Sequence, residues 1–517
     1  MGRQSRQSTE VNPPGTLDVV KARLGVAAGN RLGAEAGANV ARKGGNAVDA
    51  CVASCITAWV AEPFFVSVGG SGFIAVRTPD GTVEVIDGNN TMPSSAPTTA
   101  GQGIERTYLD YSNGMYTGIG AGSVGVPGIL AAAHTAWKRH GQIEWAALFE
   151  DAIAAARTGV SFPKTSAYYL SVTWDAIWSK FKNAHDLFSD ENGQPLVEGS
   201  LLKQPDLAES LTMMAERGPE VFYSGELARE IVETIADGDG LITPEDLAGY
   251  TAEVRAPVST NAFGWTIESN PPPSVGGAVL VHMLALLDEA SLDDPLERLS
   301  AMVEAQRAAV GFRQERYQDP GAIAGAFEEA LSTLRSKALR SPSTTHASAA
   351  DADGYACSIT ASNGYGSGLV VHGMLLNNTL GEEELNPMGV HRLPAGSRCH
   401  SNMAPTIASG PGMTVALGSP GADRIVSAIV QTFLRIAVDG ASLADAVAAP
   451  RAHLDPRREG ELLCYELDLP GAELGYTPRH YDEIHMYFGA VQAASVADDG
   501  TVDAVFDPRR SGGAALV

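Results

Sequence analysis

The first half of the chain is dominated by apolar residues at helical spacing. Residues 31–62 contain two such segments separated by a pair of glycines, and Asn46 is placed to cap the second. Residues 126–141 predict a further helix, with a proline in its first turn and a glycine just beyond its end. Residues 143–250 continue as helices with short polar breaks, and Thr243 caps one of them.

Alternation of apolar and polar residues predicts strands, most of them in the second half. Residues 72–88 have the pattern of a hairpin around a Pro-Asp-Gly turn. Residues 344–362 and 368–378 each predict two short strands joined at a turn that contains glycine, and a last hairpin is predicted within residues 493–510. Residues 412–440 predict a strand, a tight glycine loop and a long amphipathic helix. The order of these elements favours a mixed α/β (α+β) fold, with helices packed outside paired sheets.

Composition narrows the classes of partner. The 517 residues suffice for about three domains or for one large layered unit. Lys and Arg number 36 against 61 Asp and Glu, which gives a net charge of −25. Such a surface repels phosphate backbones and anionic lipids, so we expect no nucleic-acid partner and no membrane partner. The first 25 residues lack an apolar signal region, and the longest apolar stretch, between Asp49 and Glu62, is too short to cross a bilayer. We therefore expect a cytoplasmic protein.

Motifs for cofactors and metals are weak. The five cysteines form no C-x-x-C pair, so they indicate neither a zinc site nor a disulfide framework. Residues 120–125 match G-x-G-x-x-G, but no clear apolar strand precedes them, as a dinucleotide site would require. His480 and His485 have a spacing that fits no common helical metal site. We expect no cofactor and no metal.

Thr344 is the first candidate for chemistry. It follows Ser341-Pro342-Ser343, where the proline biases the chain toward an extended form, and it opens a β-branched strand. If the bond between Ser343 and Thr344 were cut, the new α-amino group, whose ordinary pKa is about 7.7–8.0, could act as the base for the threonine hydroxyl. On spacing alone, Thr344-Thr345-His346 is more typical of the ordinary start of a strand. His346 is interpreted as a packing or orienting residue.

Residues 418–422 are the second candidate. This Gly-Ser-Pro-Gly-Ala segment ends a predicted strand and opens a predicted helix, where free backbone N–H groups collect. Gly421 and Ala422 are the natural donors to an oxyanion. An ordinary glycine-rich connection would have the same pattern.

Eleven segments in order along the chain carry a family resemblance. They are "KGGNAVDACVA", "EPFFVSVGGSGF", "GSVGVPG", "VFYSGELA", "GLITPEDLAGY", "NPPPSVGG", "TTHASAADADG", "LLNN", "APTI", "GSPG" and "DPRRSGGAA". Together they resemble the γ-glutamyltransferase (γ-glutamyltranspeptidase) family of N-terminal-nucleophile hydrolases over nearly the whole length. The resemblance implies a four-layer αββα fold, autocatalytic cleavage into a large subunit (1–343) and a small subunit (344–517), and an acyl-enzyme on Thr344.

The resemblance also implies roles for individual side chains. Ser362, eighteen residues after Thr344, matches a second hydroxyl near the nucleophile's amino group, and Glu382 matches the carboxylate that reads the substrate amine. Ser401 and Asn402 match a serine pair that holds the substrate carboxylate, so one hydroxyl is kept. Asn363 is a loose match to an asparagine that contacts the substrate amine, because the loop after Ser362 is about two residues shorter than in the family.

One position departs from the family in a way that changes the expected substrate. Asn89 stands where the family has an arginine that grips the α-carboxylate of the γ-glutamyl group. A neutral amide cannot reproduce that charged, bidentate contact, whose loss costs about 1.5–3 kcal/mol. The sequence therefore predicts a self-processing amidohydrolase or acyltransferase whose small-molecule amide substrate is not a standard γ-glutamyl compound. Two alternatives stay open: a pathway-specific hydrolase of a specialised metabolite, and an uncleaved, catalytically dead ligand-binding scaffold.

Overall fold

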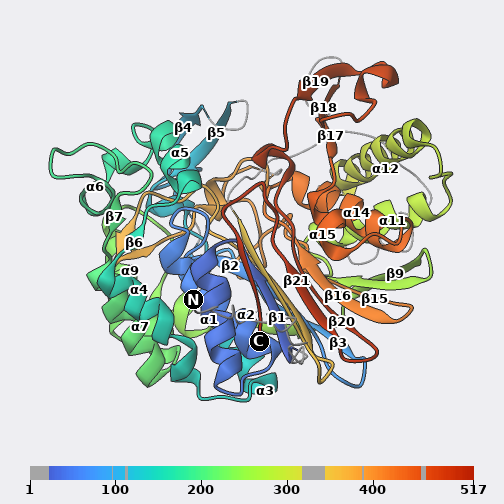
Figure 1. Ribbon diagram of the computed structural model, residues 1–517. Coiled ribbons are helices and arrows are strands. Elements are labelled where there is room, and N and C mark those ends of the chain that lie inside the picture. The colour runs from blue at the N-terminus through green and yellow to red at the C-terminus, as the bar shows by residue number, and fades with distance from the viewer. Residues whose placement is uncertain (1–21, 96, 111–113, 317–343, 387–388, 456–460) are drawn as a thin grey trace, which may run out of the picture.

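The structure is a computed structural model that describes residues 22–95, 97–110, 114–316, 344–386, 389–455 and 461–517. Two β-sheets lie face to face in the middle of the molecule, with one layer of helices outside each sheet (Figure 1). This arrangement confirms the predicted four-layer αββα fold.

The first sheet has seven strands, and every neighbouring pair is antiparallel. In spatial order they are β22 (Gly513–Leu516), β1 (Leu24–Ala28), β11 (Thr345–Asp351), β12 (Ala356–Ser362), β2 (Ser71–Arg77), β3 (Val83–Gly88) and β8 (Glu253–Arg255). The central β11 pairs with β12 from Thr345, opposite Ala361, onward. Residue 344 therefore lies just before the hydrogen-bonded ladder.

The second sheet has six strands, again antiparallel throughout. Their order is β21 (Val502–Val505), β20 (Gln492–Ala497), β16 (Met413–Gly418), β15 (Thr406–Gly410), β10 (Trp265–Ser269) and β9 (Val258–Ala262). Between the two sheets lies a buried cluster in which small side chains such as Ala75, Ala416 and Ala494 alternate with Phe73 and Ile407. The small residues allow the sheets to approach closely, because strand side chains point alternately to the two faces.

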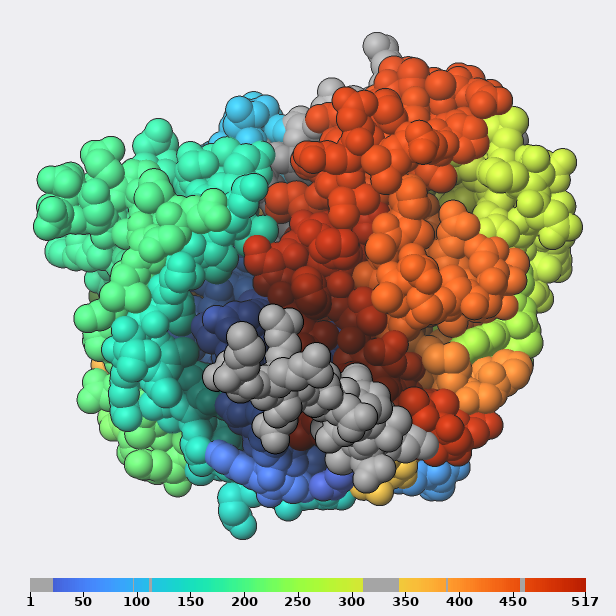
Figure 2. Space-filling view, in the orientation of Figure 1, coloured from blue at the N-terminus to red at the C-terminus, as the bar shows by residue number. Residues whose placement is uncertain are grey.

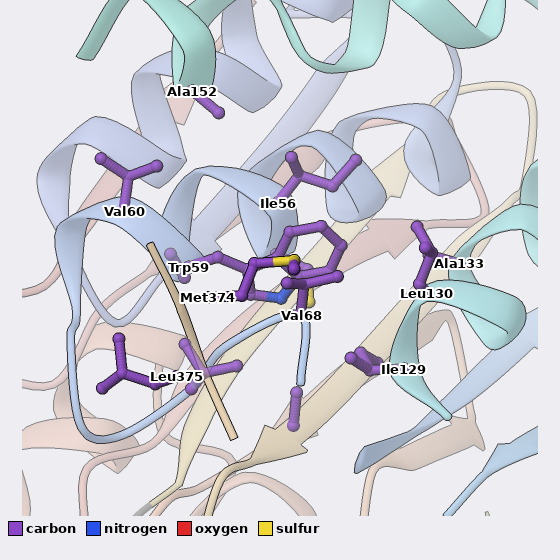
Figure 3. Close-up of a cluster of buried hydrophobic side chains, with 14 of the residues drawn as sticks. Ile56, Trp59, Val60, Val68, Ile129, Leu130, Ala133, Ala152, Met374 and Leu375 are labelled. Carbon is purple, nitrogen blue, oxygen red and sulfur yellow. The ribbon is translucent and has the colours of Figure 1, made fainter. Parts of the chain in front are cut away.

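Helices of the N-terminal half cover the first sheet. They are α1 (Arg31–Arg42), α2 (Ala47–Ala61), α3 (Ile129–His140), α4 (Glu150–Thr158), α5 (Lys164–Thr173), α6 (Lys182–Phe188), α7 (Pro205–Arg217), α8 (Glu220–Tyr223), α9 (Glu226–Asp237) and α10 (Pro244–Ala248). Every residue of α2 is buried, and its Ile56 and Trp59 lie among Val68, Ile129 and Met374 (Figure 3). The helix starts in a capping box in which Asn46 accepts hydrogen bonds from two backbone N–H groups.

The opposite layer covers the second sheet. It consists of α11 (Gly276–Asp288), α12 (Pro295–Arg316), α14 (Arg424–Ala437) and α15 (Leu443–Ala448). The apolar face of α14 packs on the sheet, where Phe433 meets the ring of Trp265 edge-on at 5.6 Å between centroids.

The remaining elements are short strands and 3-10 turns. The short strands are β4 (Glu105–Leu109), β5 (Met115–Ile119), β6 (Val160–Ser161), β7 (Leu201–Leu202), β13 (Val370–Val371), β14 (Met374–Leu375), β17 (Ala452–Asp455), β18 (Leu462–Glu466) and β19 (Thr477–Tyr481). The 3-10 turns are η1 (Ala121–Ser123), η2 (Trp145–Leu148), η3 (Trp178–Lys180), η4 (Thr379–Gly381), η5 (Gly471–Leu474) and η6 (Met486–Phe488).

Strands from both sides of residue 344 pair with one another in both sheets. In the first sheet β11, β12 and β22 follow that position in the sequence, whereas β1, β2, β3 and β8 precede it. In the second sheet β9 and β10 are the strands that precede it. Figure 2 shows red C-terminal segments in the middle of this face, between teal and green segments on one side and orange and yellow-green segments on the other. The regions 1–343 and 344–517 thus share both sheets.

Candidate active site

Thr344 lies at the edge of the central layer, directly before β11. It is 3% exposed, and its carbonyl oxygen accepts a hydrogen bond from Nη1 of Arg510 at 3.1 Å. The ladder begins at the next residue, so the Thr344 backbone is held by its continuation into β11 and by Arg510. Ser343, and with it the predicted cleavage bond, lies outside the described residues.

A narrow pocket opens at Thr344. Its walls are Ser71, Asn89, Thr344, Ser362, Thr379, Glu382, Leu385, His400, Ser401, Asn402, Met403, Ala422 and Ile425. Seven of the nine residues predicted for the site are on this list. They come from β12, from the loop after β3, from the end of η4, from the loop before β15 and from the turn before α14, so the fold brings together residues that are far apart in the sequence.

The turn between β16 and α14 supplies the predicted oxyanion donors. Gly421 has φ 127° and Ala422 has φ 62°, both in the left-handed region. A Cβ at residue 421 would lie 2.9 Å from Cα of Gly489, so this position requires glycine. Within the part of the chain that the structure describes, neither the Gly421 N–H nor the Ala422 N–H donates a hydrogen bond. Ala422 lines the pocket itself, and Gly421 is its neighbour in the turn.

Several other residues on the pocket wall are polar. Ser401 accepts a hydrogen bond at Oγ from the N–H of Met403 at 3.2 Å. The Asn89 side chain donates from Nδ2 to the carbonyl oxygen of Cys399 at 2.5 Å. Asn402 is 6% exposed, and both polar atoms of its side chain are buried without a hydrogen-bond partner among the described residues. Glu382 is almost completely buried.

Few titratable side chains line the described pocket wall. Among the described residues that line it there is no lysine or arginine, Glu382 is the one carboxylate, and His400 is the other titratable side chain. Arg398 lies close by but is engaged elsewhere: it donates to the carbonyl oxygens of Asn89 at 2.7 Å and Thr251 at 2.6 Å, and its guanidinium stacks on the Tyr250 ring.

Comparison with known proteins identifies the family to which this site belongs. The family model for gamma-glutamyltranspeptidase matches residues 33–517. The chain belongs to the γ-glutamyltranspeptidase family. It is therefore an enzyme of the hydrolase and acyltransferase class that this family comprises.

Relatives within the γ-glutamyltranspeptidase family span almost the same length. The glutathione hydrolase proenzyme of Escherichia coli (strain K12) is 28% identical, with 95% of this chain and 91% of the relative covered. The acylase ACY 1 proenzyme of Pseudomonas sp. (strain SE83) is 31% identical, with 85% and 83% covered. The crystal structure of a cephalosporin acylase from Bacillus halodurans has the same fold, with a TM-score of 0.77 at 23% identity and 99% of each chain covered.

A buried polar group beside Thr344 and Thr345 was not foreseen from the sequence. Thr345 donates from Oγ1 to Oε1 of Glu62 at 2.8 Å, and Asn30 donates from Nδ2 to the same oxygen at 2.6 Å. Burial raises the pKa of Glu62, while these two hydrogen bonds and the charge of Arg510 oppose the rise. Because Glu62 and Arg510 lie so far from residue 344 in sequence, only the fold reveals that they flank it.

His346 is a neutral packing residue in this γ-glutamyltranspeptidase fold. It is 1% exposed, and its ring nitrogens contact Oγ1 of Thr360 and Oγ of Ser348, each at 2.8 Å. Burial lowers its pKa to about 3, so the ring stays uncharged near neutral pH. Its place against Gly418 between the sheets agrees with the packing role expected from the sequence.

Of two further predicted residues, Ser362 lines the pocket and Asn363 does not. Ser362 is the last residue of β12, opposite Ser71, and both line the pocket. Asn363 is not among the lining residues: it is buried, and its Nδ2 donates to the carbonyl oxygen of Leu376 at 3.5 Å. The pocket residues that the sequence did not suggest include His400, which directly precedes the predicted Ser401 and Asn402.

The remaining observations concern metal ligands, the cysteines and membrane-spanning helices. In the described ranges no group of three His, Cys, Asp or Glu side chains is arranged to hold a metal ion. All five cysteines are buried and unpaired, and burial raises the pKa of Cys55 and of Cys399 to about 12. No helix among the described residues is long and apolar enough to cross a bilayer.

Proposed function

We propose that this protein cleaves its own chain before Thr344 and then uses Thr344 to break an amide-type bond in a small molecule. The products of self-cleavage would be a large subunit, 1–343, and a small subunit, 344–517, which remain associated. The observation that carries the proposal is the placement of Thr344 on the wall of one pocket with Ala422, whose N–H, like that of Gly421, has no partner among the described residues.

In the proposed reaction the Thr344 hydroxyl attacks the carbonyl carbon of the substrate while its free α-amino group takes the hydroxyl proton. The negative charge that develops on the carbonyl oxygen is stabilised by the N–H groups of Gly421 and Ala422. One such donor is typically worth about 2.7–4 kcal/mol of transition-state stabilisation. The same proton passes to the leaving amine, which departs and leaves an ester on Thr344. Water or an acceptor amine then attacks this ester and frees the acyl group.

Ser362 and Glu382 complete the proposed site. Ser362 is a pocket hydroxyl at the end of β12, suited to hydrogen bonding with the amino group of Thr344. Glu382 supplies the negative charge that an ammonium group on the acyl part of the substrate would require. A standard γ-glutamyl donor carries an α-carboxylate that requires a cationic partner. The described lining residues include Asn89 but no lysine or arginine, which argues against such a donor.

Intact-mass analysis and denaturing electrophoresis of the purified protein test the proposal. Wild-type protein should give two fragments divided before Thr344, and incubation with an amide panel should add an acyl mass to the smaller one. Thr344→Ala should give one intact chain and no adduct, while Thr344→Ser, which keeps a hydroxyl beside an amine, should retain cleavage. A single uncleaved wild-type chain would instead favour the ligand-binding scaffold.

A further inference from the structure

The side-chain amide of Asn402 is a buried polar group that the protein itself does not satisfy. It lies on the pocket wall with Thr344, it is 6% exposed, and neither Oδ1 nor Nδ2 has a partner among the described residues. Native proteins pair nearly all such groups, since burying one unpaired costs stability. A buried, unpaired amide on the wall of a reaction pocket indicates that the substrate supplies the partner.

The backbone around Asn402 is held in place by the start of α11. The N–H groups of Val275 and Gly276 both donate to the carbonyl oxygen of Ser401, at 2.8 and 3.2 Å. The backbone carbonyls of Asn402 and Met403 lie against Gly276, where any Cβ would collide with them. The start of α11 thus fixes the backbone of residues 401–403, from which the Asn402 side chain extends.

Asn89 contributes a second amide with a defined orientation. Its Nδ2 donates to the carbonyl oxygen of Cys399, a contact that only the nitrogen can make, so the O and N assignment follows from the contact itself. The acceptor Oδ1 is left without a partner among the described residues. Ser401 accepts at Oγ from Met403, which leaves its hydroxyl hydrogen for another acceptor. The wall therefore offers two amide oxygens as acceptors, and Asn402 Nδ2 and the Ser401 hydroxyl as donors.

This set of groups discriminates between a carboxylate and a carboxamide. A carboxylate only accepts hydrogen bonds, so it would leave both amide oxygens unsatisfied. A primary carboxamide has two N–H groups for the two amide oxygens and one carbonyl oxygen for the donors, and it carries no charge. We infer that the acyl part of the substrate carries a neutral carboxamide at this position, read by Asn402 and Asn89.

The inference rests on the proposed acyl transfer to Thr344 and names its substrate class: amino-acyl amides in which the group beside the amine is a carboxamide rather than a carboxylate. Glu382 would pair with the amine, and the asparagine pair would read the neutral neighbour. Asn402 and Asn89 are thus assigned as specificity-determining residues for the proposed reaction.

A matched set of chromogenic anilides tests the inference on the self-processed protein. The γ-p-nitroanilides of isoglutamine and of glutamate differ only in the carboxamide or carboxylate, and 4-aminobutyryl p-nitroanilide lacks both groups. We expect kcat/KM for the isoglutamine compound to exceed that for the glutamate compound by at least 10-fold. Asn402→Ala should lower the ratio of kcat/KM between the isoglutamine and 4-aminobutyryl compounds by about 10-fold, whereas Asn192→Ala, on an exposed turn, should not change this ratio.

The outcomes separate the two proposals. Acylation of Thr344 by the anilides with equal rates, or with the glutamate compound preferred, overturns the carboxamide inference and leaves the acyl-transfer proposal standing. Failure of all three compounds to acylate Thr344, measured by mass on the small subunit, overturns both. The wild-type comparison needs no substitution, so it holds even if Asn402→Ala does not fold.

Discussion

Arg510 donates a hydrogen bond from Nη1 to the carbonyl oxygen of Thr344 at 3.1 Å, across 166 positions of sequence. The guanidinium also stacks over the ring of Phe65, with 5.3 Å from Cζ to the ring centroid. A charged donor fixed in this way orients the carbonyl, and through it the hydroxyl and amine of the same residue. Arg510 is in this sense a positioning residue for the proposed nucleophile.

Replacing Arg510 should therefore reduce kcat more than it raises KM. A hydrogen bond from a charged group is worth about 1.5–3 kcal/mol, so Arg510→Gln should lower kcat by roughly 10- to 100-fold. Arg510→Lys keeps the charge but not the planar fork, so its kcat should lie between that of the wild type and that of Arg510→Gln. Steady-state kinetics on any accepted amide checks this. A raised KM with unchanged kcat would contradict the positioning role.

Ala422 is expected to act through its backbone and not through its side chain. Ala422→Gly keeps the N–H and suits φ 62°, so activity should stay within about 3-fold and the free energy of unfolding should change by less than about 1 kcal/mol. Ala422→Val puts a β-branched residue in the left-handed region and should destabilise the protein by about 1–3 kcal/mol. Urea unfolding and kinetics on both variants provide the check. Large loss of activity in the glycine variant at normal stability would argue against a backbone oxyanion donor here.

Asn89→Arg should shift preference toward carboxylate-bearing donors. A guanidinium on this wall would give an α-carboxylate the charged, bidentate partner that the described lining residues lack. We expect kcat/KM for γ-glutamyl p-nitroanilide to rise by roughly 10-fold or more relative to the isoglutamine compound. Asn89→Gln, which stays neutral, is the matched control. An unchanged ratio in a folded Asn89→Arg protein would mean that the carboxylate position does not face residue 89.

His346 should contribute to loss of stability in acid. Its pKa is lowered by burial to about 3 in the folded protein, against about 6.5 when unfolded, so the unfolded chain binds the proton more readily. The stability that depends on a neutral ring is complete above pH 6.5 and is lost as the pH falls toward 3. His346→Gln should therefore show a shallower decline of unfolding free energy over this range. Equal slopes for the variant and the wild type would show that His346 is not the group responsible.

The elements with strong local signals were predicted correctly from the sequence. The hairpin of β2 and β3, the strand pair β11 and β12, and the strand, loop and helix from β16 to α14 all occur where the pattern indicated. The caps at Asn46 and Thr243 are both capping boxes. Local side-chain to backbone hydrogen bonds decide such features, so they can be recognised without tertiary information.

Elements decided by tertiary pairing were missed. β1 (LGVAA) and β22 (GAAL) are short and rich in glycine and alanine, which favour strands weakly, and they form because β11 pairs with β1 and β1 with β22. In the site, Thr344, Ser362 and Ala422 could be named from the family pattern. The family pattern did not suggest Glu62, Arg510 or His400, because their nearness to Thr344 follows from strand order and helix docking.

The pairing of strands from either side of residue 344 within both sheets has a consequence for a chain cut at that point. A break in the backbone at that point would not create two separable bodies, since pulling them apart would strip neighbours from β1, β2 and β10 and expose the interior between the sheets. The cut protein would thus keep the hydrodynamic size and the cooperative unfolding of a single molecule. Residue 344 would become a chain end within an otherwise intact fold.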